Sequence, residues 1–122
     1  VSVRRLMRTA AHLATSSLAR VEIRSAIARL VRSRALGAKE AARALTRMER
    51  TLGEVTIVEA RGRTLDLAGE LVGRRTLRAY DAVHLASALR LAHESGSALS
   101  FGCADVTLTQ AAIDEGLRIL AL

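Results

Sequence analysis

Apolar residues recur every three or four positions along most of the chain, a spacing that places them on one face of a helix. Between residues 79 and 93, for example, Ala82, Leu85, Ala86 and Leu89 follow this spacing. The same pattern predicts helices over residues 1–12, 18–36, 38–52, 64–72, 79–93 and 107–115.

Particular residues predict where some of these helices begin and end and which face points inward. The first helix has no capping residue in front of it. Gly37, Gly73 and Gly116 are expected to end the helices that precede them. The inward face of the 64–72 helix is predicted to consist of four apolar residues: Leu65, Ala68, Leu71 and Val72.

Four short segments depart from the helical period. Residues 55–60 are rich in β-branched side chains and predict a buried strand. Residues 12–16, 98–103 and 117–122 are the other expected strands, and Ser16–Ser17 is expected to lead into the next helix as its N-cap. Because strands alternate with helices, we expect an α/β domain with a short parallel sheet that has helices on its faces.

Length and composition favour one domain over residues 1–122. Half of the residues are hydrophobic, which is enough for a packed core. The chain contains no proline. Aromatic residues make up only 2% of the chain, which argues against RNA binding by an aromatic stacking platform. No apolar run approaches the ~20 residues of a membrane-spanning helix, and residues 1–13 lack the apolar core of a signal peptide. We therefore expect a soluble, cytoplasmic protein without a membrane partner.

The chain carries a formal charge of +7, from 19 basic and 12 acidic residues. Such a surplus attracts polyanions, and arginine can bind a phosphate through two hydrogen bonds. Nucleic acid is therefore the first partner to consider. Arg43, Arg47 and Arg50 would line one side of the 38–52 helix, where they form either an ordinary solvated face or a phosphate-binding surface.

Asp81 lies in the first turn of the helix over residues 79–93. A negative charge is favourable there because the backbone N–H groups are unpaired and the helix dipole is positive. By itself, this position is explained by helix stability alone. A functional interpretation needs other residues of the chain.

Two further carboxylates are predicted at comparable places. Glu22 follows the strand over residues 12–16, and Asp105 follows the strand over residues 98–103. Ligands of parallel α/β sheets collect at the carboxyl ends of strands, and oxygen ligands suit Mg²⁺ or Mn²⁺. Glu22, Asp81 and Asp105 are therefore candidate metal ligands and catalytic residues, although Glu22 could instead pair with a neighbouring arginine.

Two other reactive side chains are assigned structural roles. His84 is close to Asp81 in sequence, but imidazole prefers Zn²⁺ or Cu²⁺ to Mg²⁺. Cys103 is expected to be a buried apolar residue, and as the sole cysteine it excludes an intramolecular disulfide and a cysteine-rich zinc site.

Three segments of the chain together resemble the PIN-domain family, specifically toxins of the VapC type. The first is Thr15-Ser16-Ser17-Leu18-Ala19-Arg20-Val21-Glu22, and the second is Leu77-Arg78-Ala79-Tyr80-Asp81-Ala82-Val83-His84-Leu85-Ala86-Ser87-Ala88. The third consists of Ala104-Asp105, Ala111-Ala112 and Glu115-Gly116-Leu117. They occur in order through nearly the whole chain, and the Tyr-Asp-Ala-x-His-Leu-Ala part is the most specific.

The resemblance implies a three-layer α/β fold and a metal-dependent endoribonuclease. Such an enzyme cuts RNA with Mg²⁺ or Mn²⁺ held by four acids, is restrained by a cognate antitoxin protein, and forms a homodimer. Glu22, Asp81 and Asp105 match three of those acids.

The fourth acid of the family ends a first strand that lies at the centre of the sheet, and the resemblance places that strand before Val1. Three explanations account for the missing strand and its acid. The translation start was assigned too late, the chain is a fragment, or the protein is an inactive relative. We favour the first two because the other three acids persist. Phe101-Gly102-Cys103-Ala104 before Asp105 also departs from the family pattern.

Two rival functions remain from the sequence. A non-catalytic module could use the arginine stripe to hold RNA, or its apolar surfaces to hold an antitoxin or a second copy of itself. A helical DNA-binding regulator would fit the charge, but it would leave the strands over residues 55–60 and 98–103 unexplained.

Overall fold

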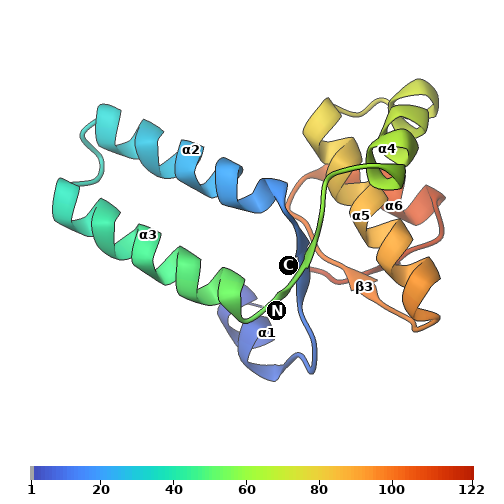
Figure 1. The fold of residues 1–122 in the computed structure, drawn as a ribbon, viewed down its shortest axis with the longest axis horizontal. Coiled ribbons are helices and arrows are strands. Elements are labelled where there is room, and N and C mark those ends of the chain that lie inside the picture. The colour runs from blue at the N-terminus through green and yellow to red at the C-terminus, as the bar shows by residue number, and fades with distance from the viewer. Residues whose placement is uncertain (1) are drawn as a thin grey trace.

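The computed structural model describes residues 2–122, and its helices and strands alternate as the apolar pattern predicts (Figure 1). The mixed α/β class is confirmed, and each predicted element has a counterpart. In chain order the elements are α1 (Val3–Thr9), β1 (Ala14–Ser16), α2 (Leu18–Arg32), α3 (Ala38–Gly53), β2 (Thr56–Val58), α4 (Arg63–Arg74), α5 (Ala79–Ser95), β3 (Ser100–Phe101), α6 (Val106–Asp114) and β4 (Arg118–Ile119).

The strands form two separate parallel pairs. β1 pairs with β2, with Thr15 opposite Ile57, and β3 pairs with β4, with Phe101 opposite Ile119. The parallel pairing predicted from the sequence is confirmed. Between residues 2 and 122, however, no ladder joins the two pairs into the single sheet that was expected.

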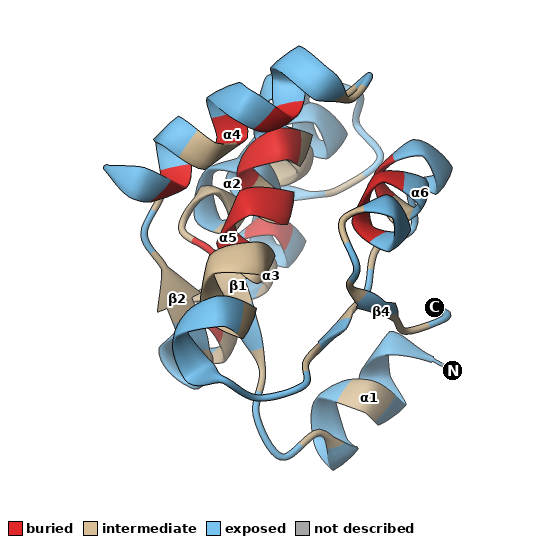
Figure 2. Ribbon diagram, turned by 90° about the vertical axis from the view of Figure 1, so that its right-hand side faces the viewer, coloured by how far each residue is buried: buried red, intermediate tan, exposed pale blue. Residues whose placement is uncertain are grey.

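The core lies where α4, α5 and α6 meet. Leu71 of α4 and Leu85 of α5 are completely buried, and Leu108 of α6 is nearly so. Figure 2 shows the buried positions concentrated on the facing sides of these helices. Burying one leucine side chain contributes about 1.5–3 kcal/mol, so these three leucines stabilise the contact among the helices.

Helices α2 and α3 form an arm that extends from the rest of the molecule (Figure 1). Glu49 of α3 holds the two helices together through Arg20, at 3.2 Å, and Arg24, at 3.0 Å. Helix α2 has no buried residue, and Leu30 and Val31 are 46% and 39% exposed. The arm therefore leaves apolar surface uncovered.

The end of α2 differs from the prediction. The helix stops at Arg32, several residues early, because Arg34 adopts a left-handed conformation with φ of +61°. Leu30 O then accepts the amide hydrogens of both Ala35 and Leu36. Gly37 does not end α2; it precedes α3, where the side chain of Glu40 accepts its amide hydrogen at 3.2 Å.

The start of the first helix also differs from the prediction. Ser2 caps α1, because its hydroxyl accepts the Arg5 amide hydrogen at 3.3 Å. The expectation that this helix has no capping residue was therefore wrong.

Helix α4 runs through Gly73 to Arg74, so Gly73 does not end it as predicted. Leu65 and Val72, expected to face inward, are 47% and 41% exposed. The covered face contains Thr64, which is buried together with Ala68 and Leu71. Leu65 and Val72 each lie one residue beyond that face, about 100° further round the helix.

The strand predicted to be buried is only partly so. Ile57 and Val58 of β2 are half-buried and Thr56 is exposed. Pairing with β1 covers one edge of β2 but neither of its faces, which only packed helices could bury. No helix within residues 2–122 is long and apolar enough to span a membrane.

Candidate functional site

Asp81 lies in the first turn of α5, as predicted, and only 15% of its side chain is exposed. Arg78, at the N-cap position of the same helix, donates from Nε to Asp81 Oδ2 at 3.0 Å. The carboxylate thus has two favourable neighbours, the positive end of the helix dipole and a guanidinium group. Asp81 is the least exposed of the three candidate carboxylates. The Glu22 side chain is 44% exposed, and Asp105 is an exposed residue.

Arg78 has a more exposed position than its partner. Its side chain is 66% exposed, and Cζ lies 5.3 Å from the centre of the Tyr80 ring. The hydrogen bond to Asp81, followed by the charge of Asp81, raises the pKa of Arg78, and the charge of Asp105 contributes in the same direction. Arg78 therefore lies within the electrostatic field of two of the predicted site carboxylates.

Glu22 reaches the same helix through a histidine. His84 Nε2 lies 3.0 Å from Glu22 Oε1 and 2.9 Å from Oε2. His84 follows Asp81 by three residues, so it lies one helical turn along α5. Among residues 2–122, no arginine forms the alternative ion pair with Glu22. The structural role expected for His84 agrees with this contact, which also places Glu22 beside α5.

Asp105 begins α6 and does not simply end a strand. Its Oδ1 accepts the Leu108 amide hydrogen at 2.7 Å, which is the interaction of an N-cap. Cys103, expected to be buried, is half-buried and its Sγ lies 3.1 Å from the Thr109 hydroxyl. Capping occupies one carboxylate oxygen of Asp105 and fixes the side chain near the start of the helix.

The three carboxylates offer only oxygen ligands, which fits Mg²⁺ or Mn²⁺. Glu22, Asp81 and Asp105 are held by His84, Arg78 and the α6 backbone respectively. Within residues 2–122, no three His, Cys, Asp or Glu side chains lie close enough together to hold one ion. A metal ion would therefore have to displace Arg78 or His84 to gather these ligands.

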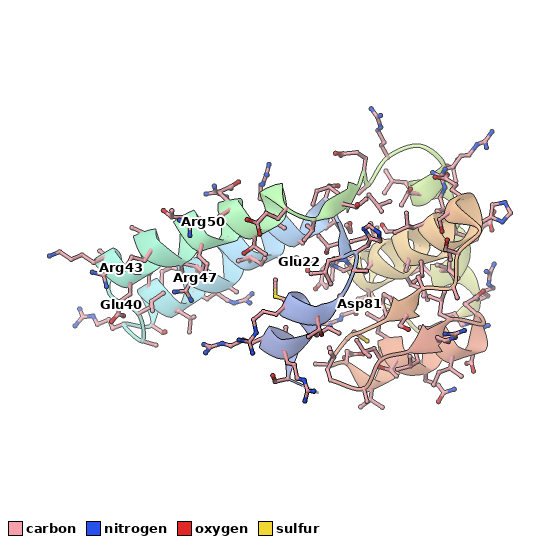
Figure 3. The ribbon with its side chains drawn as sticks, turned by 90° about the horizontal axis from the view of Figure 1, so that it is seen from below. Glu22, Glu40, Arg43, Arg47, Arg50 and Asp81 are labelled. Atoms are coloured by element: carbon pink, nitrogen blue, oxygen red, sulfur yellow. The ribbon has the colours of Figure 1, made fainter. Side chains whose placement is uncertain are left out.

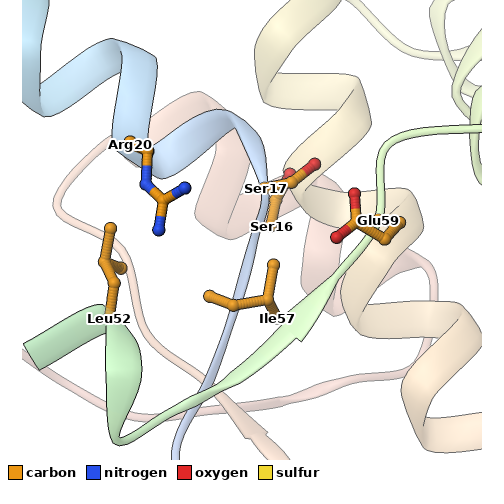
Figure 4. Close-up of a pocket in the computed structure, with 6 residues that line it drawn as sticks. All are labelled: Ser16, Ser17, Arg20, Leu52, Ile57 and Glu59. Atoms are coloured by element: carbon orange, nitrogen blue, oxygen red, sulfur yellow. The ribbon is translucent and has the colours of Figure 1, made fainter. Parts of the chain in front are cut away.

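A cavity of about 140 Å³ opens beside the carboxyl ends of β1 and β2 (Figure 4). Ser16 and Ser17, the predicted capping pair, line it with Arg20 and Glu59. Ser16 Oγ accepts the Leu18 amide hydrogen at 3.1 Å. Ser17 occupies the N-cap position of α2 but does not cap it with its side chain. Its hydroxyl instead accepts the amide hydrogen of Ala60, which connects α2 to the chain after β2.

The predicted arginine stripe is on the arm. Arg43, Arg47 and Arg50 are all exposed, and Figure 3 shows them along α3, away from Asp81. They lie on the side of α3 opposite Met48, which is buried. This surface is separate from the acidic residues at α5.

Sequence reasoning missed the role of Arg78. A basic residue three positions before a first-turn acid is within reach of it on a helix. The spacing of Arg78 and Asp81 could therefore have predicted their contact. The contact between Glu22 and His84 joins residues far apart in sequence and had no comparable local signal.

The comparison with known protein families matches the PIN domain over residues 1–101. Among curated proteins, none matches the chain. The matched range includes Glu22 and Asp81 and ends before Asp105. A PIN domain is a nuclease-type fold, and its members typically use divalent metal ions and bind RNA. Because the match covers most of the sequence, this chain belongs to the PIN domain family.

Proposed function

We propose that this chain is the catalytic domain of a metal-dependent endoribonuclease of the VapC toxin type. Glu22, Asp81 and Asp105 would hold Mg²⁺ or Mn²⁺ and orient the attacking water. The observation that carries the proposal is the position of two of these acids at α5. Asp81 lies in the first turn of that helix and His84 holds Glu22 against it, while Asp105 is the N-cap of α6.

The chemistry follows from the ligand type. A bound divalent ion lowers the pKa of water and offsets the charge of the phosphodiester. The protein must supply carboxylates of fixed position, and Asp81 is well suited because it is mostly buried at a helix terminus. Glu22, with 44% of its side chain exposed, has room to reach either an ion or a water molecule.

The partners follow from charge and exposed apolar surface. A net charge of +7 favours RNA as substrate. Val3 and Met7 of α1 and Ile23 and Leu30 of α2 are at least 38% exposed, which favours protein contacts. We therefore include in the proposal a cognate antitoxin, a homodimer and a cytoplasmic location.

A non-catalytic binding module is the second candidate. The observation in its favour is that each carboxylate already has a partner, while Arg43, Arg47 and Arg50 are exposed and free to contact phosphates. Such a module would bind RNA without cutting it.

Cleavage of an end-labelled RNA distinguishes the two candidates. The reaction is run with Mg²⁺ or Mn²⁺ and again with a chelator, using the chain and its variants. We expect metal-dependent cutting that Asp81→Asn or Glu22→Gln reduces about a hundredfold or more. Asp66→Asn is the matched control, because Asp66 is an exposed first-turn acid of α4.

Binding of RNA by the chain, without cutting under any metal condition, would contradict the nuclease proposal. It would support the binding module instead.

A further inference from the structure

The positive charge of the chain is concentrated on the arm formed by α2 and α3. Residues 18–53 contain nine basic and three acidic residues, a net charge of +6, and residues 1–17 add three arginines. Residues 54–122 contain seven basic and nine acidic residues, a net charge of −2. Because the arm extends away from the packed helices (Figure 1), a large polyanion can approach it without meeting the acidic half of the chain.

Most basic side chains of the arm have no acidic partner. Glu49 pairs with Arg20 and Arg24, but no other basic residue of the arm forms an ion pair within residues 2–122. All of these unpaired side chains are exposed: Arg29, Arg32, Arg34, Lys39, Arg43, Arg47 and Arg50. They are therefore available to an anionic partner.

Lys39 lies on the same face of α3 as the arginine stripe. It precedes Arg43 by four residues, so the four cations lie within about 80° around the helix and span about 16 Å of its axis. The buried residues of α3 lie on the opposite side: Ala41, Met48 and Leu52. Glu40 lies beside the cations, and its side chain accepts the Gly37 amide hydrogen. The result is a straight row of exposed cations on a rigid element.

We propose that Lys39 and the arginine stripe bind the phosphate backbone of a base-paired RNA stem. The inference rests on the RNA partner of the proposed function and adds a contact surface that lies apart from Asp81 (Figure 3). It requires no catalytic step, so it applies to a nuclease and to a non-catalytic module alike.

Composition favours a base-paired stem over an unpaired strand. Proteins that hold unpaired RNA commonly stack its bases on aromatic side chains, and residues 18–53 contain no Phe, Tyr or Trp. A stem holds its phosphates in fixed positions, so a rigid row of cations can contact several of them without ordering a flexible strand. Three of the four cations are arginines, which bind phosphate through paired N–H groups.

The test measures binding of a labelled RNA stem-loop and of an unpaired RNA strand of equal length, with a chelator present so that neither is cut. The unmodified chain should bind the stem-loop about fivefold or more tightly than the strand. The stripe variant, with Arg43→Gln, Arg47→Gln and Arg50→Gln, should weaken stem-loop binding about tenfold or more. It should also reduce the slope of log affinity against log salt by about three.

The matched control removes the same charge from the other half of the chain. Arg61→Gln, Arg63→Gln and Arg118→Gln change three exposed arginines outside the arm, and together they should weaken binding by less than about threefold. A third variant, with Arg43→Lys, Arg47→Lys and Arg50→Lys, should keep the salt slope and lose part of the affinity. Circular dichroism checks that each variant folds, and the substituted positions are all exposed.

Each contrary outcome has a defined meaning. Equal weakening by the stripe variant and the control would show that net charge alone holds the RNA, which overturns the proposal. Equal binding of the stem-loop and the strand would overturn the base-paired partner. Competition by poly-glutamate that matches competition by unlabelled stem-loop would overturn it in favour of an acidic protein.

These outcomes also separate the inference from the proposed function. Full stem-loop binding by the stripe variant would overturn the role of the arm and leave RNA as the proposed partner. Absence of RNA binding by the unmodified chain would contradict both.

Discussion

At the start of α5, the Asp81 carboxylate stabilises the helix, and we propose that it also binds an ion. Its first-turn position and its bond to Arg78 are both favourable without a metal. The exposed first-turn acid of α4, Asp66, stabilises its helix dipole in the same way. The two residues therefore differ in their surroundings and not in their helix position.

Glu115 offers a residue-level test of the ion pairs around α6. Hydrogen bonds from Arg74 and, more weakly, Arg75 hold the pKa of Glu115 below its ordinary value, against the opposing effect of partial burial. A lowered folded pKa stabilises the protein above the unfolded pKa. That stabilisation is lost as the pH falls through the folded pKa.

We therefore expect Glu115→Gln to cost about 1 kcal/mol at pH 7. The difference from the unmodified protein should shrink as the pH falls below the ordinary glutamate pKa of about 4. Urea unfolding at pH 7 and at pH 3 measures it. A difference of the same size at both pH values would show that the ion pairs do not stabilise the fold.

The sequence identified the carboxylates of the candidate site but not their partners. Asp81 and Asp105 were recognisable because helix starts have a local signature. The contact of Glu22 with His84 depends on how α2 packs against α5, which no local pattern encodes. The role of the three acids as ligands stays a prediction.

At the scale of single elements, α5 ends through a glycine that needs its conformational freedom. Gly96 is left-handed with φ of +62°, whereas Gly69 lies inside α4, where an added Cβ would meet no atom within 4 Å. Gly96→Ala should destabilise the protein by about 1 kcal/mol. Gly69→Ala should stabilise it by about 0.5–1 kcal/mol.

Thermal unfolding of the two glycine variants measures these opposite changes. A destabilising effect of Gly69→Ala as large as that of Gly96→Ala would mean that the conformation of Gly96 is not the cause.

A second element-level test concerns the link between α2 and β2. Ser17 Oγ accepts the Ala60 amide hydrogen at 2.9 Å. Ser17→Ala removes that acceptor and should cost about 1 kcal/mol. Ser25→Ala, at an exposed position of α2, is the control and should change stability by less than about 0.5 kcal/mol. Urea unfolding compares them, and equal effects would refute a structural role for the Ser17 hydroxyl.

Helices were predicted better than strands for a physical reason. A helix satisfies its hydrogen bonds within one segment, so the spacing of Leu85 and its neighbours was sufficient. A strand needs a partner, and the 98–103 segment pairs over only Ser100 and Phe101. The early end of α2 escaped prediction because Arg34, a residue type that seldom takes positive φ, adopts that conformation.

At the scale of the whole molecule, the described chain has a well-packed half and an open half. Helices α4, α5 and α6 share the buried core, whereas α2 has no buried residue. The two strand pairs have no connecting ladder in residues 2–122, and Phe101 and Ile119 of the β3–β4 pair pack against the core.

This asymmetry predicts uneven protection from hydrogen exchange. Amides of α2 should exchange through local opening, well before those of α5, because α2 has no buried residue. Hydrogen exchange measured by mass spectrometry or NMR follows the amides of α2 and α5 in the same sample, so each helix serves as the reference for the other. Equal protection of α2 and α5 would mean that the arm unfolds only together with the core.

Binding of a divalent metal ion by Asp81 is the central claim and can be measured directly. Titration of Mn²⁺ into the chain, Asp81→Asn and Asp66→Asn, with thermal unfolding of each, compares two first-turn acids of similar helix role. We predict that Asp81→Asn weakens Mn²⁺ binding about tenfold or more, while Asp66→Asn leaves it unchanged. Equal Mn²⁺ binding by all three proteins would contradict the claim and leave Asp81 as a helix-start residue.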